Sequence, residues 1–150
     1  MRLTIFTDYS LRVLIYLGAH RNAEQLTTIG DIAAAYRISE NHLMKVVHHL
    51  AKHGYVETTR GKGGGMQLAR APEEINIGAV VRITEDDLAL VECFEGGAPK
   101  CPIVPVCTLQ GALARALHAF LEVLDGQTLA DLLQPQAQLV KIFRAARAAR

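Results

Sequence analysis

The sequence predicts a mainly α-helical protein with a small β-wing, arranged as a winged helix-turn-helix followed by a long dimerisation helix. Three observations lead to this fold class. Two short helical patterns separated by a tight turn lie at residues 27–54, and two short strand-like runs around a glycine-rich tip follow them directly. A longer helix comes later, and its apolar side chains recur at helical spacing at Leu109, Leu113, Leu117, Phe120, Leu121 and Leu124. We therefore expect a winged helix-turn-helix DNA-binding domain at residues 1–71, and a cysteine-bearing loop with dimerisation helices at residues 72–150.

Length, charge and hydrophobicity restrict the function classes. The chain has 150 residues, of which 50% are hydrophobic, so one core can form and some apolar surface is left for a partner. The net charge is +1, but residues 1–71 carry nine basic and five acidic side chains, which suits a polyanion partner. No apolar run reaches the roughly 18–20 residues of a membrane helix, and Asp8 stands where a signal peptide would be apolar. We expect a cytoplasmic protein without membrane contact.

The first helix is predicted at residues 11–19, where apolar side chains occur on nearly all sides. Thr7 or Asp8 can cap its start, and residues 18–22 can end it. A helix of this kind is buried on more than one face, so one side can meet a second subunit. Asp8 is explained without any ligand as an N-cap, or as a charge that favours the positive end of the helix dipole.

The helix-turn-helix pattern at residues 27–54 has the spacing of a DNA-reading motif. Its second helix opens with Ser39 or Asn41 as a cap and stops at Gly54. The N-terminal residues of a recognition helix contact base edges, and His42 is the histidine that we expect to touch DNA. Many helical hairpins bind nothing, so the two helices alone are a weak signal. The candidate DNA contacts of this helix are Ser39, Asn41, His42 and Lys45.

A β-hairpin is predicted directly after the second helix, with strands at residues 54–60 and 66–70 and a flexible basic tip at residues 61–65. A hairpin in this place is a wing, and its Arg60 and Lys62 can reach phosphates or a minor groove. The alternative is a nucleotide-binding loop that cradles phosphates. The sequence argues against it, because no strand-to-helix transition follows the glycines and no Gly-Lys-Ser/Thr ending closes them.

A long helix is predicted at residues 109–124, with Thr108 as its cap. Ala112, Ala116 and Ala119 permit the close approach of another helix. One domain of this size cannot easily bury this helix together with the first one, so we expect it to pair antiparallel with its copy in a twofold dimer.

Shorter helices complete the second half of the chain. One is expected to begin near Asn76 and to run to residue 83. A second, capped helix is expected at residues 128–133, and a last one within residues 138–150.

All three cysteines, Cys93, Cys101 and Cys107, fall within fifteen residues that also hold three of the five prolines. Proline fixes φ and cannot donate a backbone hydrogen bond, so this stretch is predicted to be an ordered loop. Structural zinc sites usually show close cysteine pairs, which are missing here, whereas iron–sulfur clusters accept wider gaps between thiolates. Three thiolates leave one iron with a different or exchangeable ligand, as a sensor of small molecules requires. Another metal, a thiol switch, or unrelated free thiols remain as alternatives.

Several segments together resemble one known family. They are Phe6-Thr7-Asp8-Tyr9, residues 38–43, residues 54–56 with the tip at 60–65, the cysteine loop with residues 109–124, and residues 128–132. This combination resembles the NsrR family of nitric-oxide-sensing iron–sulfur repressors, which are winged-helix relatives of the iron–sulfur cluster regulator IscR. Three residues after the last cysteine, Gln110 stands where the cluster-homeostasis branch has a histidine, and this favours the nitric-oxide branch.

The resemblance implies a homodimer that binds palindromic double-stranded promoter DNA while it holds a cluster, most simply [4Fe–4S], with [2Fe–2S] as the alternative. It implies that nitric oxide attacks the cluster, that DNA affinity drops, and that genes for nitric-oxide detoxification are released. The implied ligands are Cys93, Cys101 and Cys107, with Asp8 of the partner subunit as the fourth.

Other functions remain open at this point. An iron–sulfur or redox sensor of the same fold would respond to cluster status or to oxidants. A metal- or thiol-binding protein could use the helix-turn-helix only as an interaction scaffold, without binding DNA. An enzyme is not expected, because no nucleophile–base pair or carboxylate dyad stands at a useful spacing.

Overall fold

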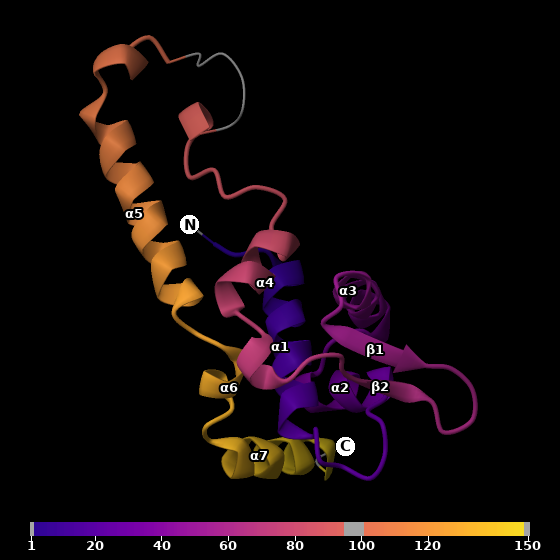
Figure 1. Cartoon of the computed structure of the whole chain (residues 1–150). Helices are drawn as coiled ribbons and strands as arrows, with labels where there is room; N and C mark the ends of the chain where they lie inside the picture. The colour runs from indigo at the N-terminus through magenta and orange to yellow at the C-terminus, as the bar shows by residue number, and fades with distance from the viewer. Residues whose placement is uncertain (1, 95–100, 149–150) are drawn as a thin grey trace.

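The computed structural model of the chain describes residues 2–94 and 101–148, and it is mainly helical with a two-stranded wing (Figure 1). The predicted fold class is therefore confirmed. Three short 3₁₀ turns, at Pro72–Glu74, Glu92–Phe94 and Val104–Val106, accompany the main elements. The helices and strands are α1 (Ile5–Ala19), α2 (Ile29–Tyr36), α3 (Glu40–Lys52), β1 (Val56–Thr59), β2 (Gly65–Leu68), α4 (Ile77–Thr84), α5 (Thr108–Asp125), α6 (Leu129–Leu132) and α7 (Gln136–Ala148).

Helix α1 lies at the centre of one well-packed body, which we call the head (residues 2–84 and 126–148). α3, α4, α6, α7 and β2 pack around α1, and α2 packs between α3 and α7. The core includes Leu14 from α1, Leu50 from α3, Leu129 from α6 and Phe143 from α7, all of them buried. The core thus takes side chains from both sides of residue 71, while the predicted division into two domains at that point stays a prediction.

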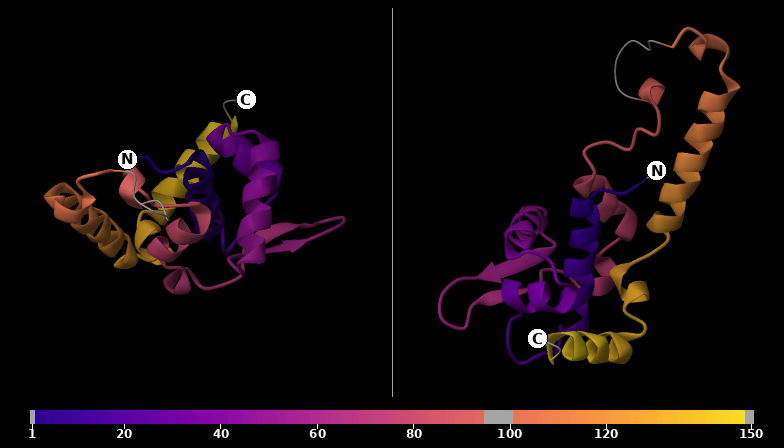
Figure 2. Two further views of the ribbon diagram at one scale, coloured as in Figure 1. Left: turned by 90° about the horizontal axis from the view of Figure 1, so that it is seen from above. Right: turned by 180° about the vertical axis from the view of Figure 1, so that it is seen from behind.

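The remaining residues form the arm (residues 85–94 and 101–125), which projects from the head (Figures 1 and 2). Most of the arm is α5, and none of its 18 residues is buried. Apolar side chains on its surface include Leu109, which is 63% exposed, and Val123, which is 68% exposed. Because exposed apolar surface is unfavourable in water, these side chains favour contact with a further surface. No helix in the described part of the chain has the length and apolarity that crossing a membrane requires.

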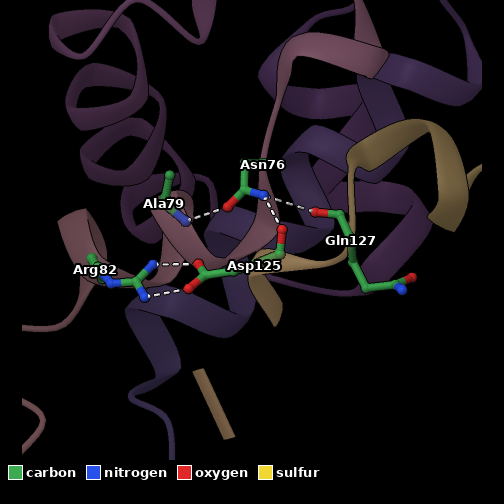
Figure 3. Close-up of polar contacts among 5 residues, drawn as sticks. All are labelled: Asn76, Ala79, Arg82, Asp125 and Gln127. Carbon is green, nitrogen blue, oxygen red and sulfur yellow. Dashed lines mark hydrogen bonds and ion pairs between the residues drawn. The ribbon is translucent and has the colours of Figure 1, made fainter. Parts of the chain in front are cut away.

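The C-terminal end of α5 is fastened to α4 by polar contacts (Figure 3). The Arg82 guanidinium donates hydrogen bonds of 2.5 and 2.7 Å to the two carboxylate oxygens of Asp125. The Asn76 side chain donates to the Asp125 carbonyl at 2.7 Å, and its own oxygen accepts from the Ala79 amide at the start of α4. Gly78 has no side chain, which leaves room for the Asp125 carboxylate. The arm is thus held at its base while its outer end extends away.

Several helix starts differ from the prediction. Thr4 is the N-cap of α1 and accepts a hydrogen bond from the Thr7 amide at 3.2 Å, so neither Thr7 nor Asp8 caps this helix. Cys107, and not Thr108, is the N-cap of α5. The physical reason is that an N-cap residue needs an extended backbone, which Thr4 and Cys107 have, whereas Thr7 and Thr108 are already helical. Ser39 precedes α3 as predicted, but its side chain makes no capping bond.

Candidate functional site

The predicted contacts on the second helix lie on the exposed side of α3. Arg37 adopts a left-handed conformation with φ of 57°, which makes the turn between α2 and α3 tight. The buried side of α3 packs on the head through Leu43, Val46, Val47 and Leu50. The opposite side is open to solvent, and it carries all four predicted contacts, Ser39, Asn41, His42 and Lys45. The His42 ring also lies 6.2 Å from the Tyr9 ring of α1, which helps to hold the start of α3 against α1.

The wing presents two further cations beside α3. β1 and β2 pair antiparallel, from Val56 opposite Leu68 to Thr59 opposite Gly65. The tip between them contains Gly61 and Gly63 with positive φ of 95° and 77°, a conformation that glycine adopts without strain. Arg60 and Lys62 are exposed at this tip. Neither side chain forms an ion pair with any residue in the part of the chain that the structure describes, so both are available to phosphates.

Arg70 fixes the base of the wing to the end of α3, a role that the sequence analysis missed. Its guanidinium donates to the carbonyls of Gly54 and His53 at 2.8 and 2.9 Å, and it lies over the Tyr55 ring at 4.6 Å. Arg70 therefore ties the base of the wing to the C-terminal end of α3. Pairing with backbone carbonyls leaves no charge pattern in the sequence, so no local signal could have identified Arg70.

The three cysteines lie on the arm as free thiols. Cys93 is half-buried in the Glu92–Phe94 turn, Cys101 is exposed, and Cys107 is half-buried at the N-cap of α5. The predicted loop has neither α-helix nor strand where it is described, and its residues 95–100 lie outside the described residues. Within residues 2–94 and 101–148 of a single chain, no three histidine, cysteine or acidic side chains lie close enough to hold one metal ion. One chain by itself does not bring the predicted ligands together.

Asp8 lies in the first turn of α1 and is paired with Arg12 one turn later. Arg12 Nε donates to Asp8 Oδ1 at 3.0 Å, and Arg12 Nη2 lies 2.9 Å from Asp8 Oδ2. The Arg12 guanidinium also lies 5.6 Å from the centre of the Tyr36 ring. The Asp8 side chain is 48% exposed, so a second molecule can reach its carboxylate. The spacing of four residues between an acid and an arginine on one helix is a signal that the sequence analysis overlooked.

Comparison with known proteins bears on this arrangement. The Rrf2 family, described as iron-dependent transcriptional regulators, matches residues 3–135. The chain belongs to the Rrf2 family. It is a DNA-binding transcriptional regulator, and the resemblance to NsrR regulators seen in the sequence is confirmed.

Two similar relatives both carry the name HTH-type transcriptional regulator NsrR. The protein of Geobacillus kaustophilus is 55% identical over 144 residues, which cover 96% of this chain and 97% of that protein. The protein of Bacillus subtilis strain 168 is 54% identical over 144 residues, which cover 96% of this chain and 98% of that protein.

Three solved structures of regulators are similar in fold. T. potens IscR has a TM-score of 0.72 at 26% identity and covers 90% of this chain and 88% of its own. CymR, the global cysteine regulator of B. subtilis, has a TM-score of 0.71 at 30% identity, with 88% and 95% covered. The oxidised form of Staphylococcus aureus CymR has a TM-score of 0.70 at 25% identity, with 89% and 97% covered.

Proposed function

We propose that this Rrf2-family regulator is a homodimeric repressor, gated by an iron–sulfur cluster that senses nitric oxide, and that it controls genes for nitric-oxide detoxification. The observation that carries the proposal is the similarity over 96% of the chain to regulators named NsrR, in a chain whose three free thiols all lie on the arm. The DNA contacts proposed are those of the exposed side of α3 together with Arg60 and Lys62 of the wing.

The exposed surface of the single chain supports a dimer. The chain exposes 9614 Å², whereas a compact monomer of 16.4 kDa would expose about 7,500 Å². The excess, roughly 2,000 Å², is of the size that an obligate dimer buries. One stripe of α5 is apolar, exposed and spaced by alternating steps of three and four residues, as in helices that pair side by side. It consists of Leu109, Ala112, Ala116, Ala119 and Val123.

The candidate ligands fit an iron–sulfur cluster by their chemistry. Thiolates are the usual ligands of such clusters, and three are present on the arm. Cys107 stands at the N-cap of α5, so one of the three thiols lies directly at the start of the long helix. Asp8 of the partner subunit would supply the fourth ligand, and a hard carboxylate among thiolates is the most readily lost. We propose [4Fe–4S], with [2Fe–2S] as the alternative.

Arg12 determines when Asp8 is available. Both Asp8 oxygens contact Arg12 in the single chain, so iron would compete with Arg12 for the Asp8 carboxylate. When bound, the cluster supplies iron that nitric oxide can attack. When the cluster no longer binds Asp8, the carboxylate can pair with Arg12 again. Both residues lie on α1, and α3 packs on this helix. A change in the partner of Asp8 therefore alters the helix that supports the recognition helix α3.

The test uses full-length protein purified without oxygen and a DNA duplex selected with that protein from a random pool. We expect iron and sulfide in the protein, visible absorption that nitric oxide bleaches, and loss of duplex binding in step with the bleaching. Asp8→Asn should weaken retention of iron, while Asp86→Asn, an exposed acid at the start of the arm, serves as the matched control. The gating claim fails if the anaerobic protein contains no iron and still binds its duplex tightly.

A second candidate is a thiol-based redox sensor of the same fold. The exposed thiol of Cys101 favours it, as does the fold similarity to the regulator solved in an oxidised form. Duplex binding that responds to oxidant in iron-free protein, and that is abolished by Cys101→Ser, would support this candidate over the cluster.

A further inference from the structure

The last turn of α4 is the place where the arm leaves the head, and it is bonded to the start of α1. The buried hydroxyl of Thr7 donates to the Thr84 hydroxyl at 2.9 Å, and the Thr4 amide donates to the Glu85 carboxylate at 2.8 Å. Asp8 directly follows Thr7, and Glu85 begins the segment that leads to Cys93. The two chain segments that carry candidate ligands therefore meet at this junction, formed by Thr4, Thr7, Ile83, Thr84 and Glu85.

The recognition helix reaches the same junction through His49. Its Nε2 donates a hydrogen bond of 2.8 Å to the carbonyl of Ile83, in the last turn of α4. The last carbonyls of a helix have no partner inside the helix, so the imidazole satisfies a group that α4 leaves open. α3 otherwise packs mainly on α1, α2 and β1, and α4 packs mainly on α1 and α5. The bond is thus a direct connection from the recognition helix to the root of the arm.

The His49 side chain is held on one side and has space on the other. The Phe6 ring meets it edge-on at 5.3 Å between ring centres, and the His53 ring lies 4.3 Å away. A cavity of about 330 Å³ opens beside it, bordered by Phe6, Ile83 and Asp86. The end of α4 therefore borders open space beside His49, and a shift into that space would lengthen or break the hydrogen bond.

We propose that His49 is a positioning residue for DNA recognition, which transmits a change at the root of the arm to the orientation of α3 through its bond to the Ile83 carbonyl. The inference rests on the proposed gating function. A displacement of the cysteine segment, or the departure of Asp8 from Arg12, moves the junction. His49 passes that movement to the side of α3 that carries Asn41 and Lys45.

Three substitutions separate the hydrogen bond from the packing. His49→Phe keeps an aromatic ring against Phe6 but removes the donor. His49→Gln keeps a donor at a similar distance from the backbone, and His49→Asn, which is too short to reach the carbonyl, replaces His49→Phe if that variant does not fold. His53→Phe is the matched control, because the only hydrogen bond that the structure describes for the His53 side chain goes to the His49 carbonyl, one turn earlier, and not to α4.

Two measurements are made on each full-length variant. The first is the ratio of duplex dissociation constants between iron-free and iron-loaded protein. We expect His49→Phe to lower this ratio at least fivefold, because one hydrogen bond is removed from each of two subunits. His49→Gln and His53→Phe should give ratios within twofold of the wild type. The second is hydrogen exchange of α3 amides in iron-free protein, which we expect to become at least threefold faster in His49→Phe alone.

The outcomes distinguish the two claims. If wild-type protein shows no difference between its iron-free and iron-loaded forms, the proposed gating fails, and hydrogen exchange still tests the His49 bond. If the wild type shows the difference and His49→Phe retains it with unchanged exchange in α3, the role of His49 is overturned. A loss shared equally by His49→Phe and His49→Gln would also overturn it, because packing and not the donor would then be responsible.

Discussion

The head and the arm differ in what covers their apolar side chains. In the head, Leu14, Leu43 and Leu50 are completely buried by helices of the same chain. In the arm, α5 is longer than any helix of the head, and yet none of its own residues is buried. The described part of the head thus has a core within one chain, whereas the described part of the arm has none. Under the proposed function this difference has a use, because a segment without its own core can be reorganised by a partner or a ligand.

The largest expected effect comes from the core of the head. Leu50→Ala should lower the free energy of unfolding by about 2–5 kcal/mol, because it removes fully buried methyl groups and leaves a cavity. Leu109→Ala on the arm is the matched control and should change the unfolding of dilute monomer by less than about 0.5 kcal/mol. Urea titrations at low and high protein concentration measure both. Equal losses in the two variants at low concentration would contradict the distinction between head and arm.

The second prediction concerns the exposed stripe of α5. Ala116 lies midway between Leu109 and Val123, so in an antiparallel twofold pair it should face its own copy. Ala116→Glu would place two like charges together and should raise the dimer dissociation constant at least tenfold, or about 1.4 kcal/mol. Ala114→Glu, which is exposed on another side of α5, should leave it nearly unchanged. Analytical ultracentrifugation measures the dimer dissociation constant of each variant. Equal increases for Ala116→Glu and Ala114→Glu would rule out the stripe as the interface.

The third prediction addresses the DNA-contacting face of the head. Lys62→Ala should reduce the slope of log affinity against log salt by about 0.9 for each phosphate that the protein no longer neutralises, so by about 1.8 for a dimer. Lys141→Ala on α7, an exposed lysine away from the wing, is the control. Fluorescence anisotropy of a labelled duplex over a salt series gives the slope. A slope that the two variants lower alike would show that Lys62 acts only through net charge.

The helices and the wing of the head could be predicted from the sequence, whereas the hydrogen bonds that connect the head to the arm could not. Residues 27–54 have helical spacing, turn residues and caps that are all local, so the helix-turn-helix and the wing followed from short stretches of sequence. The alanines of α5 were also recognisable from their spacing as a surface for another helix, and their pairing with a second copy stays a prediction. By contrast, Ile83 is 34 residues from His49 and Asp125 is 43 residues from Arg82. No periodicity connects such distant residues, and a backbone carbonyl as acceptor has no signature in the sequence.

The ligand set shows the same limit. The cysteines were recognisable by residue type, and Asp8 only through the resemblance to a family. Its pairing with Arg12 could have been inferred from a spacing of four residues on one helix. A site completed by a second chain cannot be derived from the periodicity of one chain, and this is why Asp8 as a ligand stays a prediction.

The smallest effect is expected at the ion pair that joins the head to the base of the arm. The hydrogen bonds from Arg82 lower the pKa of the Asp125 carboxyl below its ordinary value. A carboxyl whose pKa is lowered by folding contributes stability above its unfolded pKa, about 3.9, and that contribution disappears as the pH falls through its folded value. The melting temperature of wild type should therefore exceed that of Asp125→Asn by a constant margin from pH 7 to pH 5. The margin should vanish at lower pH.

Both side chains of this pair are 43% exposed, so the margin should be small and should shrink as salt is added. Asp86→Asn is the control, because the Asp86 carboxylate accepts no guanidinium hydrogen bond within residues 2–94 and 101–148. A margin that persists below the folded pKa would mean that Asp125→Asn acts through the geometry of Asn76 and Gly78 and not through charge. The pair lies where α5 meets α4, so a melting-temperature margin that depends on pH would show that charge attraction attaches the base of the arm to the head. This attachment leaves the exposed stripe of α5 available to a second copy.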